Sequence, residues 1–201
     1  MNRILAILVI LMVSVMTTAC INNLAIQELN NKAKAYMEAG ETDKAICRYK
    51  SSLDLDDSVF ETNYNLGVAY VTAKQYDEAI DALKNAIKID SNMADSYYSL
   101  AVALENKAYE KIRGEETEEK TGEEAQTAEY AEEQQVKPKE YTAEQKEVIS
   151  KLLMDAIENY NKYLSLNPAA EDKEKVSSGV ESLNKELLKY SGDSEPAEDK
   201  D

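Results

Sequence analysis

The chain of 201 residues is long enough for one modest domain with appendages. Hydrophobic residues make up 43% of it, and the small numbers of Gly (6) and Pro (3) favour helices over strands and turns. The formal net charge of −16 argues against nucleic-acid partners and against electrostatic docking on anionic lipid, because both need clustered Lys and Arg. The sequence has no His, which excludes Ser-His-Asp and Cys-His nucleophiles, His-ligated zinc and an imidazole base.

The N-terminus has the pattern of an export signal. Arg3 and the amino terminus supply positive charge before a mostly apolar stretch over residues 4–15. This stretch is shorter than the roughly 20 apolar residues that a transmembrane helix needs. We therefore predict a signal peptide over residues 1–19.

A cysteine follows the predicted signal directly. Thr18 and Ala19 precede Cys20, and small residues before a cysteine resemble the lipobox of bacterial lipoproteins, in which the cysteine is lipidated and becomes the mature N-terminus. Thr17 departs from that motif, which usually has Leu or another aliphatic residue there. The resemblance implies a lipid anchor such as palmitate on Cys20, with residues 20–25 as a linker. A plain cleaved signal or an uncleaved anchor is the alternative.

The main signal in the chain is a repeat of small and apolar residues every 34 positions. Ala45 and Ala79 stand at this spacing, and so do Ile46 and Ile80. The same spacing relates Ala33, Gly67 and Ala101, then Tyr36, Tyr70 and Leu104, and also Tyr49 and Leu83, Leu53 and Ile87, and Asp56 and Asp90. A fixed period in this range is typical of stacked supersecondary units, and apolar steps of three and four within each unit predict paired helices. We expect the small residues where two helices approach closely.

The third unit begins at residue 94 and is interrupted. Its second helix resumes at Ala156, which lies 77 residues after Ala79 and therefore 43 beyond the period. Helical periodicity continues into both ends of the interruption, so we expect two lengthened helices that pack on each other. Between them, residues 114–139 are rich in Glu, Gln, Thr and Lys, and Val136 is their one large aliphatic side chain. This composition predicts disorder.

These residues resemble the tetratricopeptide repeat. Leu66, Gly67 and Tyr70 match that family's order of large and small positions, although the aromatic residue near the repeat start and the terminal Pro are replaced in the first two units. The resemblance implies an all-α superhelix, or α-solenoid, of three helix–turn–helix repeats with a C-terminal capping helix and an acidic insertion in repeat 3. The implied segments are 26–59, 60–93 and 94–168 for the repeats, about 110–147 for the insertion, 169–190 for the capping helix and 191–201 for a disordered acidic tail.

Members of this family usually bind partners in the concave groove formed by the first helix of each repeat. Projecting the family pattern gives the partner-binding candidates Asn30, Lys34, Met37, Tyr64, Val68, Val71, Tyr98 and Val102, with Glu105 at the edge. Some members clamp a peptide carboxylate with Lys and Asn, but Tyr64 and Val68 stand in their place here. A groove of Tyr and Val better suits an apolar or amphipathic helix or an extended segment of another protein. Alternatively, these side chains cover the neighbouring helix and bind nothing.

Metal and catalytic sites are not expected. The acidic run over residues 115–124 matches no calcium-binding loop and indicates solvated charge. The chain has no glycine-rich phosphate-binding motif and no cysteine pair with metal spacing. Cys47 lies within a helical unit, and we interpret it as a small packing residue. We predict no catalytic residue, no metal and no cofactor.

The sequence thus predicts a non-enzymatic interaction scaffold or adaptor, anchored by its lipid to the outer membrane or to the outer face of the cytoplasmic membrane. Similar lipoproteins serve in envelope assembly, secretion and solute uptake, so we expect protein partners from these processes and no nucleic acid. Two alternatives remain. One is a structural lipoprotein that self-associates and has no groove ligand. The other, with the least support, is an enzyme that uses carboxylates alone.

Overall fold

The computed structural model describes residues 22–114 and 141–191. Within these ranges the chain forms seven helices and no strand, as expected for an all-α fold. Several predicted features lie outside the described residues. They are the signal peptide, the lipidation site Cys20, most of the acidic insertion, and all but the first residue of the C-terminal tail.

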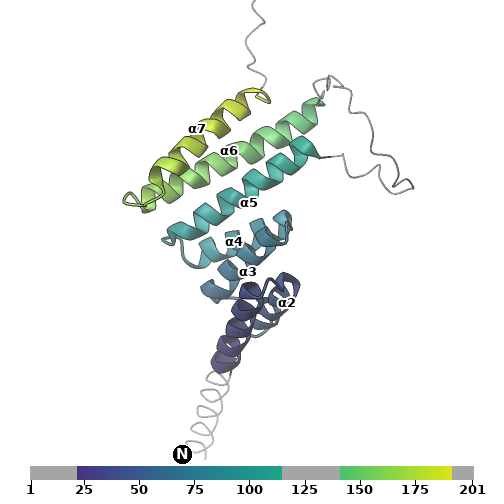
Figure 1. The fold of residues 1–201 in the computed structure, drawn as a ribbon, viewed down its shortest axis with the longest axis vertical. Helices are drawn as coiled ribbons and strands as arrows, with labels where there is room; N and C mark the ends of the chain where they lie inside the picture. Colours follow the sequence, from purple (N-terminus) through teal and green to yellow (C-terminus); the bar gives the residue numbers. More distant parts are fainter. Residues whose placement is uncertain (1–21, 115–140, 192–201) are drawn as a thin grey trace, which may run out of the picture.

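Two helical hairpins form the first part of the stack. A helix over residues 22–38 pairs with α2 (Thr42–Leu53), and α3 (Phe60–Thr72) pairs with α4 (Tyr76–Ile89). Figure 1 shows the hairpins following one another along the length of the molecule. Residues 22–25, which the sequence assigned to a linker, already belong to the first helix, since no Gly or Pro stops it there. The repeat limits drawn from the sequence stay predictions.

The turns inside these two hairpins use the same backbone geometry. Gly40 has a φ of 74°, and Lys74, which lies one repeat later, has a φ of 60°. In both turns the next residue donates a backbone hydrogen bond back to a tyrosine carbonyl, from Glu41 to Tyr36 at 2.8 Å and from Gln75 to Tyr70 at 2.9 Å. This is the usual way to end a helix with a left-handed residue, and only the first turn has the glycine that suits it.

The third hairpin is longer than the first two. α5 (Ala94–Arg113) has 20 residues and α6 (Ala143–Leu166) has 24, whereas α3 has 13 and α4 has 14. The predicted lengthening of both helices is therefore confirmed. The N-terminus of α6 is fixed by a capping box between Thr142 and Gln145. The Tyr141 hydroxyl, just before it, donates to the Ile112 carbonyl at 2.6 Å and so holds the extended end of α5 against α6.

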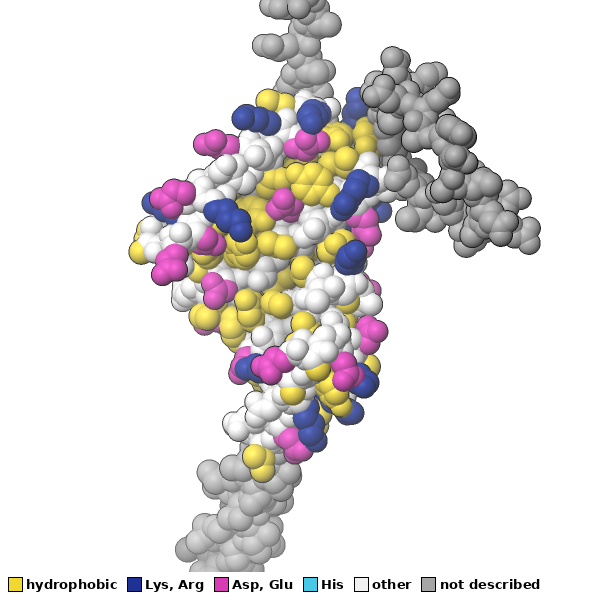
Figure 2. All heavy atoms as spheres, in the orientation of Figure 1, with side chains coloured by type: hydrophobic (Ala, Val, Ile, Leu, Met, Phe, Trp, Pro, Cys, Tyr) yellow, Lys and Arg dark blue, Asp and Glu magenta, His cyan; other side chains and the backbone are white. Residues whose placement is uncertain are grey.

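A seventh helix, α7 (Lys173–Leu188), covers α6 on the side away from α5. Val176 and Leu183 are the buried residues of α7, and the Tyr163 hydroxyl on α6 donates to Asp172 at 2.7 Å just before α7 begins. α5, α6 and α7 lie side by side in Figure 1, and Figure 2 shows charged side chains spread over the surface that includes α7. This is the arrangement expected of a capping helix with a polar outer side.

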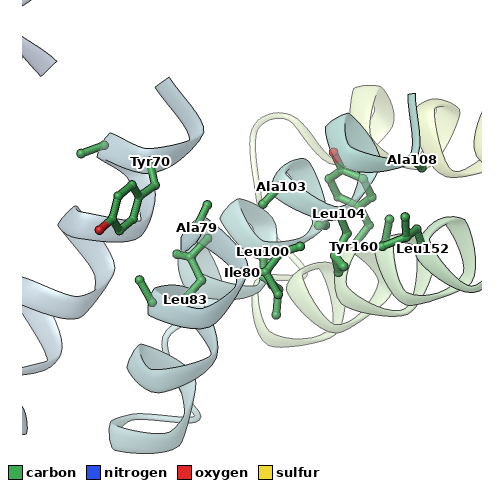
Figure 3. Close-up of a cluster of buried hydrophobic side chains, with 14 of the residues drawn as sticks. Tyr70, Ala79, Ile80, Leu83, Leu100, Ala103, Leu104, Ala108, Leu152 and Tyr160 are labelled. Atoms are coloured by element: carbon green, nitrogen blue, oxygen red, sulfur yellow. The ribbon is translucent and has the colours of Figure 1, made fainter. Parts of the chain in front are cut away.

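The core is continuous from one hairpin to the next. Figure 3 shows buried side chains of α3, α4, α5 and α6, with Leu83, Leu100, Leu104 and Tyr160 among them. The small residues that the period predicted at close approaches are buried, namely Ala33, Gly67, Ala101, Ala45, Ala79 and Ala156. The interpretation of Cys47 as a packing residue is wrong, because it is exposed. On α2 the inward positions are those of Ala45, Ile46, Tyr49 and Ser52, and Cys47 lies on the opposite side of the helix.

Candidate functional site

The candidate site is the surface carried by the first helix of each hairpin, which we call the first-helix face. On α3 this face presents Phe60, Tyr64, Val68 and Val71, which recur at steps of three and four and therefore form one row. All four are half-buried. The rings of Phe60 and Tyr64 stack with their centroids 6.0 Å apart, so this part of the row is held in place by its own packing.

α5 carries a second row of the same length. Tyr98, Val102, Glu105 and Tyr109 follow one another at steps of four, three and four, and each is half-buried. Tyr160 on α6 packs behind this row and is 8% exposed. The ring of Tyr98 meets that of Tyr160 edge-on, with centroids 5.7 Å apart, and lies 5.2 Å from the ring of Tyr163. These contacts fix the ring of Tyr98 on the face.

Glu105 is the charged member of the α5 row. The buried hydroxyl of Tyr160 donates to Glu105 Oε2 at 2.6 Å. Burial, together with this hydrogen bond, raises the pKa of Tyr160. Burial also raises the pKa of Tyr109, and the charge of nearby Glu105 adds to that effect. Both phenols are therefore neutral hydrogen-bond donors at physiological pH, while Glu105 supplies an acceptor.

The first hairpin contributes less open surface than the sequence suggested. Asn30 is only 5% exposed, and its side-chain amide donates to Thr62 Oγ1 of α3 at 2.8 Å. Lys34 is exposed but forms an ion pair with Glu61 of α3. Met37 is half-buried and packs against the core. Asn30 and Lys34 thus join the first helix to α3.

Five of the predicted groove residues are half-buried on α3 and α5, namely Tyr64, Val68, Val71, Tyr98 and Val102. Sequence reasoning missed Tyr109 and Tyr160. Tyr109 was missed because the projected family pattern stops within one repeat length, although the same helical spacing continues to it. Tyr160 could not be placed beside Glu105 from spacing, since 55 residues separate them. Figure 2 shows hydrophobic side chains gathered in a band over the region of α5 to α7, with acidic side chains among them.

One shallow hollow lies between α4, α5 and α6, with Ile80, Leu104 and Leu152 among its lining residues and Asp and Lys side chains mixed around them. Among residues 22–114 and 141–191, no group of three or more Cys, Asp or Glu side chains could hold a metal ion. None of the helices in these two ranges has both the length and the apolar character needed to cross a membrane.

Comparison with known proteins finds a family match over part of the chain. The family model described as "TPR repeat", the tetratricopeptide repeat, matches residues 69–107. No curated protein sequence matches the chain.

Solved structures share the fold at low sequence identity. The first tetratricopeptide domain of Spaghetti (RPAP3), bound to the HSP90 peptide SRMEEVD, has a TM-score of 0.54 at 16% identity, covering 81% of this chain and 93% of its own. The tetratricopeptide domain of Sgt2 from Aspergillus fumigatus has a TM-score of 0.56 at 16% identity, covering 88% and 87%. The type III secretion translocator chaperone SycD of Yersinia enterocolitica has a TM-score of 0.55 at 14% identity, covering 80% and 84%. The chain therefore folds as an all-α tetratricopeptide superhelix with a C-terminal capping helix.

Proposed function

We propose that this chain is a non-enzymatic protein–protein interaction scaffold that holds a helix or an extended segment of a partner protein on its first-helix face. Tetratricopeptide domains generally mediate protein–protein interactions, and two of the similar structures are a domain bound to an HSP90 peptide and a secretion chaperone. The observation that carries the proposal is the pair of rows of half-buried Tyr and Val side chains on the two first helices α3 and α5.

The composition of this row suits a partner surface. Tyr and Val supply apolar area, and a tyrosine adds a hydroxyl that can form a hydrogen bond. For this reason tyrosines are enriched among the interface residues that contribute most of the binding free energy. Because Tyr64 stacks on Phe60 and Tyr98 packs on Tyr160, these rings lose little freedom when a partner covers them. The nearby charges of Lys34 and Glu61 already neutralise each other.

We further propose that the scaffold acts in a bacterial cell envelope. The support is the N-terminal sequence, with its predicted signal peptide and a cysteine at position 20 preceded by Thr18 and Ala19. Lipidation of Cys20 would hold the solenoid at a membrane and would place its partners among envelope-assembly, secretion or uptake proteins. Metabolic labelling with an alkyne fatty acid tests this anchor. Label is expected on the wild-type chain and not on Cys20→Ser, and an unlabelled wild-type chain would contradict the anchor.

Binding on the face is tested with two matched double variants. Tyr64→Ala with Val68→Ala removes two side chains of the face. Val148→Ala with Met154→Ala removes two apolar side chains from α6, where Val148 is 44% and Met154 is 50% exposed. In-cell crosslinking and affinity capture should recover the partner with wild type and with the α6 variant. The face variant should bind the partner at least about thirtyfold more weakly, because two central interface side chains each contribute on the order of 1 kcal/mol or more.

Circular dichroism of the same variants must show unchanged helicity. Equal recovery of the partner by the folded face variant would refute binding on this face. Sedimentation of the wild-type chain distinguishes the self-association alternative, which requires a sedimentation coefficient that rises with protein concentration.

A further inference from the structure

Glu105 occupies an unusual place on the first-helix face. It lies at the position one repeat after Val71, within a row whose other members are Tyr98, Val102 and Tyr109. Its side chain is half-buried. Among the described residues, none of the ion pairs includes Glu105. A partly desolvated carboxylate without a cation is unfavourable, so a feature of this kind needs an explanation.

Two other carboxylates, one on α3 and one on α7, differ from Glu105. Glu61 on α3 pairs with Lys34, and Glu186 on α7 pairs with Lys189. Glu105 instead accepts one hydrogen bond, from the hydroxyl of Tyr160. A carboxylate has about four lone-pair sites on its two oxygens. One phenol therefore orients the group and leaves acceptor capacity for a further donor.

The surroundings of Glu105 are aromatic. Tyr98 and Tyr160 meet edge-on, and both Glu105 and Tyr98 lie near enough to Tyr160 to affect its ionisation. Tyr109 follows Glu105 by one helical turn on the same face. The faces of tyrosine rings carry negative potential and attract ammonium and guanidinium groups. The carboxylate and the half-buried rings of Tyr98 and Tyr109 thus favour the same kind of ligand group, which is a cation on an apolar stem.

We propose that Glu105, Tyr98 and Tyr109 form a subsite for one Lys or Arg side chain of the partner segment bound on the first-helix face, with Glu105 held in position by the hydroxyl of the buried Tyr160. This inference rests on the proposed function, and it adds the chemistry of the partner. The segment presents apolar side chains to Tyr64 and Val68, and a basic side chain to Glu105. Its aliphatic stem packs on the rings while its charged end pairs with the carboxylate.

The net charge of the whole chain also favours a basic partner segment. A formal net charge of −16 attracts basic segments from a distance and repels acidic ones. The subsite then selects where along the segment the basic residue must lie. Electrostatic attraction without a subsite would depend on the number of basic residues in the segment and not on the identity of residue 105.

The test uses small probes of the side chain together with the full-length protein. n-Butylguanidinium represents the end of an Arg side chain, and n-butylurea is a neutral probe of similar shape. Binding is followed by NMR of tyrosine rings labelled with 13C. We expect saturable shifts of Tyr98 and Tyr109 resonances with n-butylguanidinium, and binding by n-butylurea that is weaker by about five- to tenfold, as for a half-buried charge pair.

Glu105→Gln is the deciding variant, because its amide oxygen can still accept the hydrogen bond from Tyr160 while the charge is gone. Glu110→Gln is the matched control, since it removes the same charge from an exposed position of α5. The preference for the guanidinium probe is expected to disappear in Glu105→Gln and to persist in Glu110→Gln. Equal preference in both variants would overturn the subsite.

The two proposals fail in different ways. If Tyr64→Ala with Val68→Ala still recovers the partner, binding on the face is refuted. If that variant loses the partner while Glu105→Lys recovers it as well as Glu110→Lys does, the face binds a segment and the basic subsite is refuted. Loss of the partner in Glu105→Lys and retention in Glu110→Lys supports the subsite.

Discussion

The substitution Gly67→Ala tests whether close packing between helices requires a small residue at this position of the repeat. A Cβ atom added at Gly67 would lie 2.5 Å from Cγ and 2.8 Å from Cδ2 of Leu83 on α4. Leu83 is 0% exposed, so its side chain has no solvent to move into. The contact also falls on the branch point of the leucine, and α3 or α4 must shift to relieve it. Overpacking of a core costs about 1–3 kcal/mol.

Gly67→Ala also has a favourable effect, because alanine is a better helix former than glycine by about 1 kcal/mol. Since the clash involves Cγ of a fully buried residue, we take the upper part of the overpacking range and expect a net loss of about 1–2 kcal/mol. For a chain of this size that corresponds to a fall in Tm of about 2–8 °C. Thermal and urea unfolding followed by circular dichroism measure both quantities.

Two further variants separate the effect of overpacking from the effect of helix propensity. Gly179 lies inside α7 with nothing within 4 Å of an added Cβ, so Gly179→Ala should stabilise the chain by about 0.5–1 kcal/mol from helix propensity alone. Leu83→Ala should cost about 2–5 kcal/mol in the wild-type background, and at least about 1 kcal/mol less in the Gly67→Ala background because the new methyl group occupies part of the space. If Gly67→Ala stabilises the chain as much as Gly179→Ala, or if the Gly67 and Leu83 effects add without coupling, the packing argument is wrong.

Three other features give shorter tests. Lys74 has a left-handed backbone, so Lys74→Gly should raise the free energy of unfolding by about 1 kcal/mol, and Gly40→Ala at the equivalent turn should lower it by a similar amount; unchanged urea midpoints would contradict this. Thr62→Val removes the acceptor of the buried Asn30 amide and should cost about 1–3 kcal/mol in urea unfolding, whereas Thr62→Ser should keep most of the stability. Burial raises the pKa of Tyr49 from its ordinary value of 10.0 to about 12. Because the folded state then holds this proton more tightly than the unfolded state, stability should be level below about pH 10 and fall between about pH 10 and 12, and Tyr49→Phe should fall less across that window.

The fold could be predicted because small residues at a fixed period leave few ways to pack. Ala45, Ala79 and Ala156 are each 0% exposed, so each spacing that was counted in the sequence corresponds to a close approach in the structure. The lengthening of α5 and α6 was also predictable, since apolar residues kept their helical spacing beyond the repeat unit.

The candidate site was only partly predictable, because a surface position depends on what the neighbouring helix contributes. Asn30 occupies a groove position in the family pattern, but Thr62 lies opposite it and accepts its hydrogen bond, and this removes Asn30 from the surface. Glu105, in contrast, stays on the surface, and its carboxylate is oriented by the hydroxyl of Tyr160, which lies on a helix that begins after the insertion. Neither partner follows from the local sequence around Asn30 or Glu105.

The interruption of the period and the proposed subsite are connected through the length of α5. One repeat before Tyr109 stands Gln75, which lies beyond the end of α3 at Thr72 and caps the start of α4. A third repeat with a first helix as short as α3 would therefore put residue 109 in a turn, away from the row of Tyr98, Val102 and Glu105. α5 continues through Arg113, and this extra helix keeps Tyr109 one turn from Glu105 on the same face. The departure from the repeat is thus what adds the last aromatic ring to the subsite, and a variant with α5 and α6 shortened to repeat length should keep the fold and bind n-butylguanidinium more weakly than the wild-type chain does.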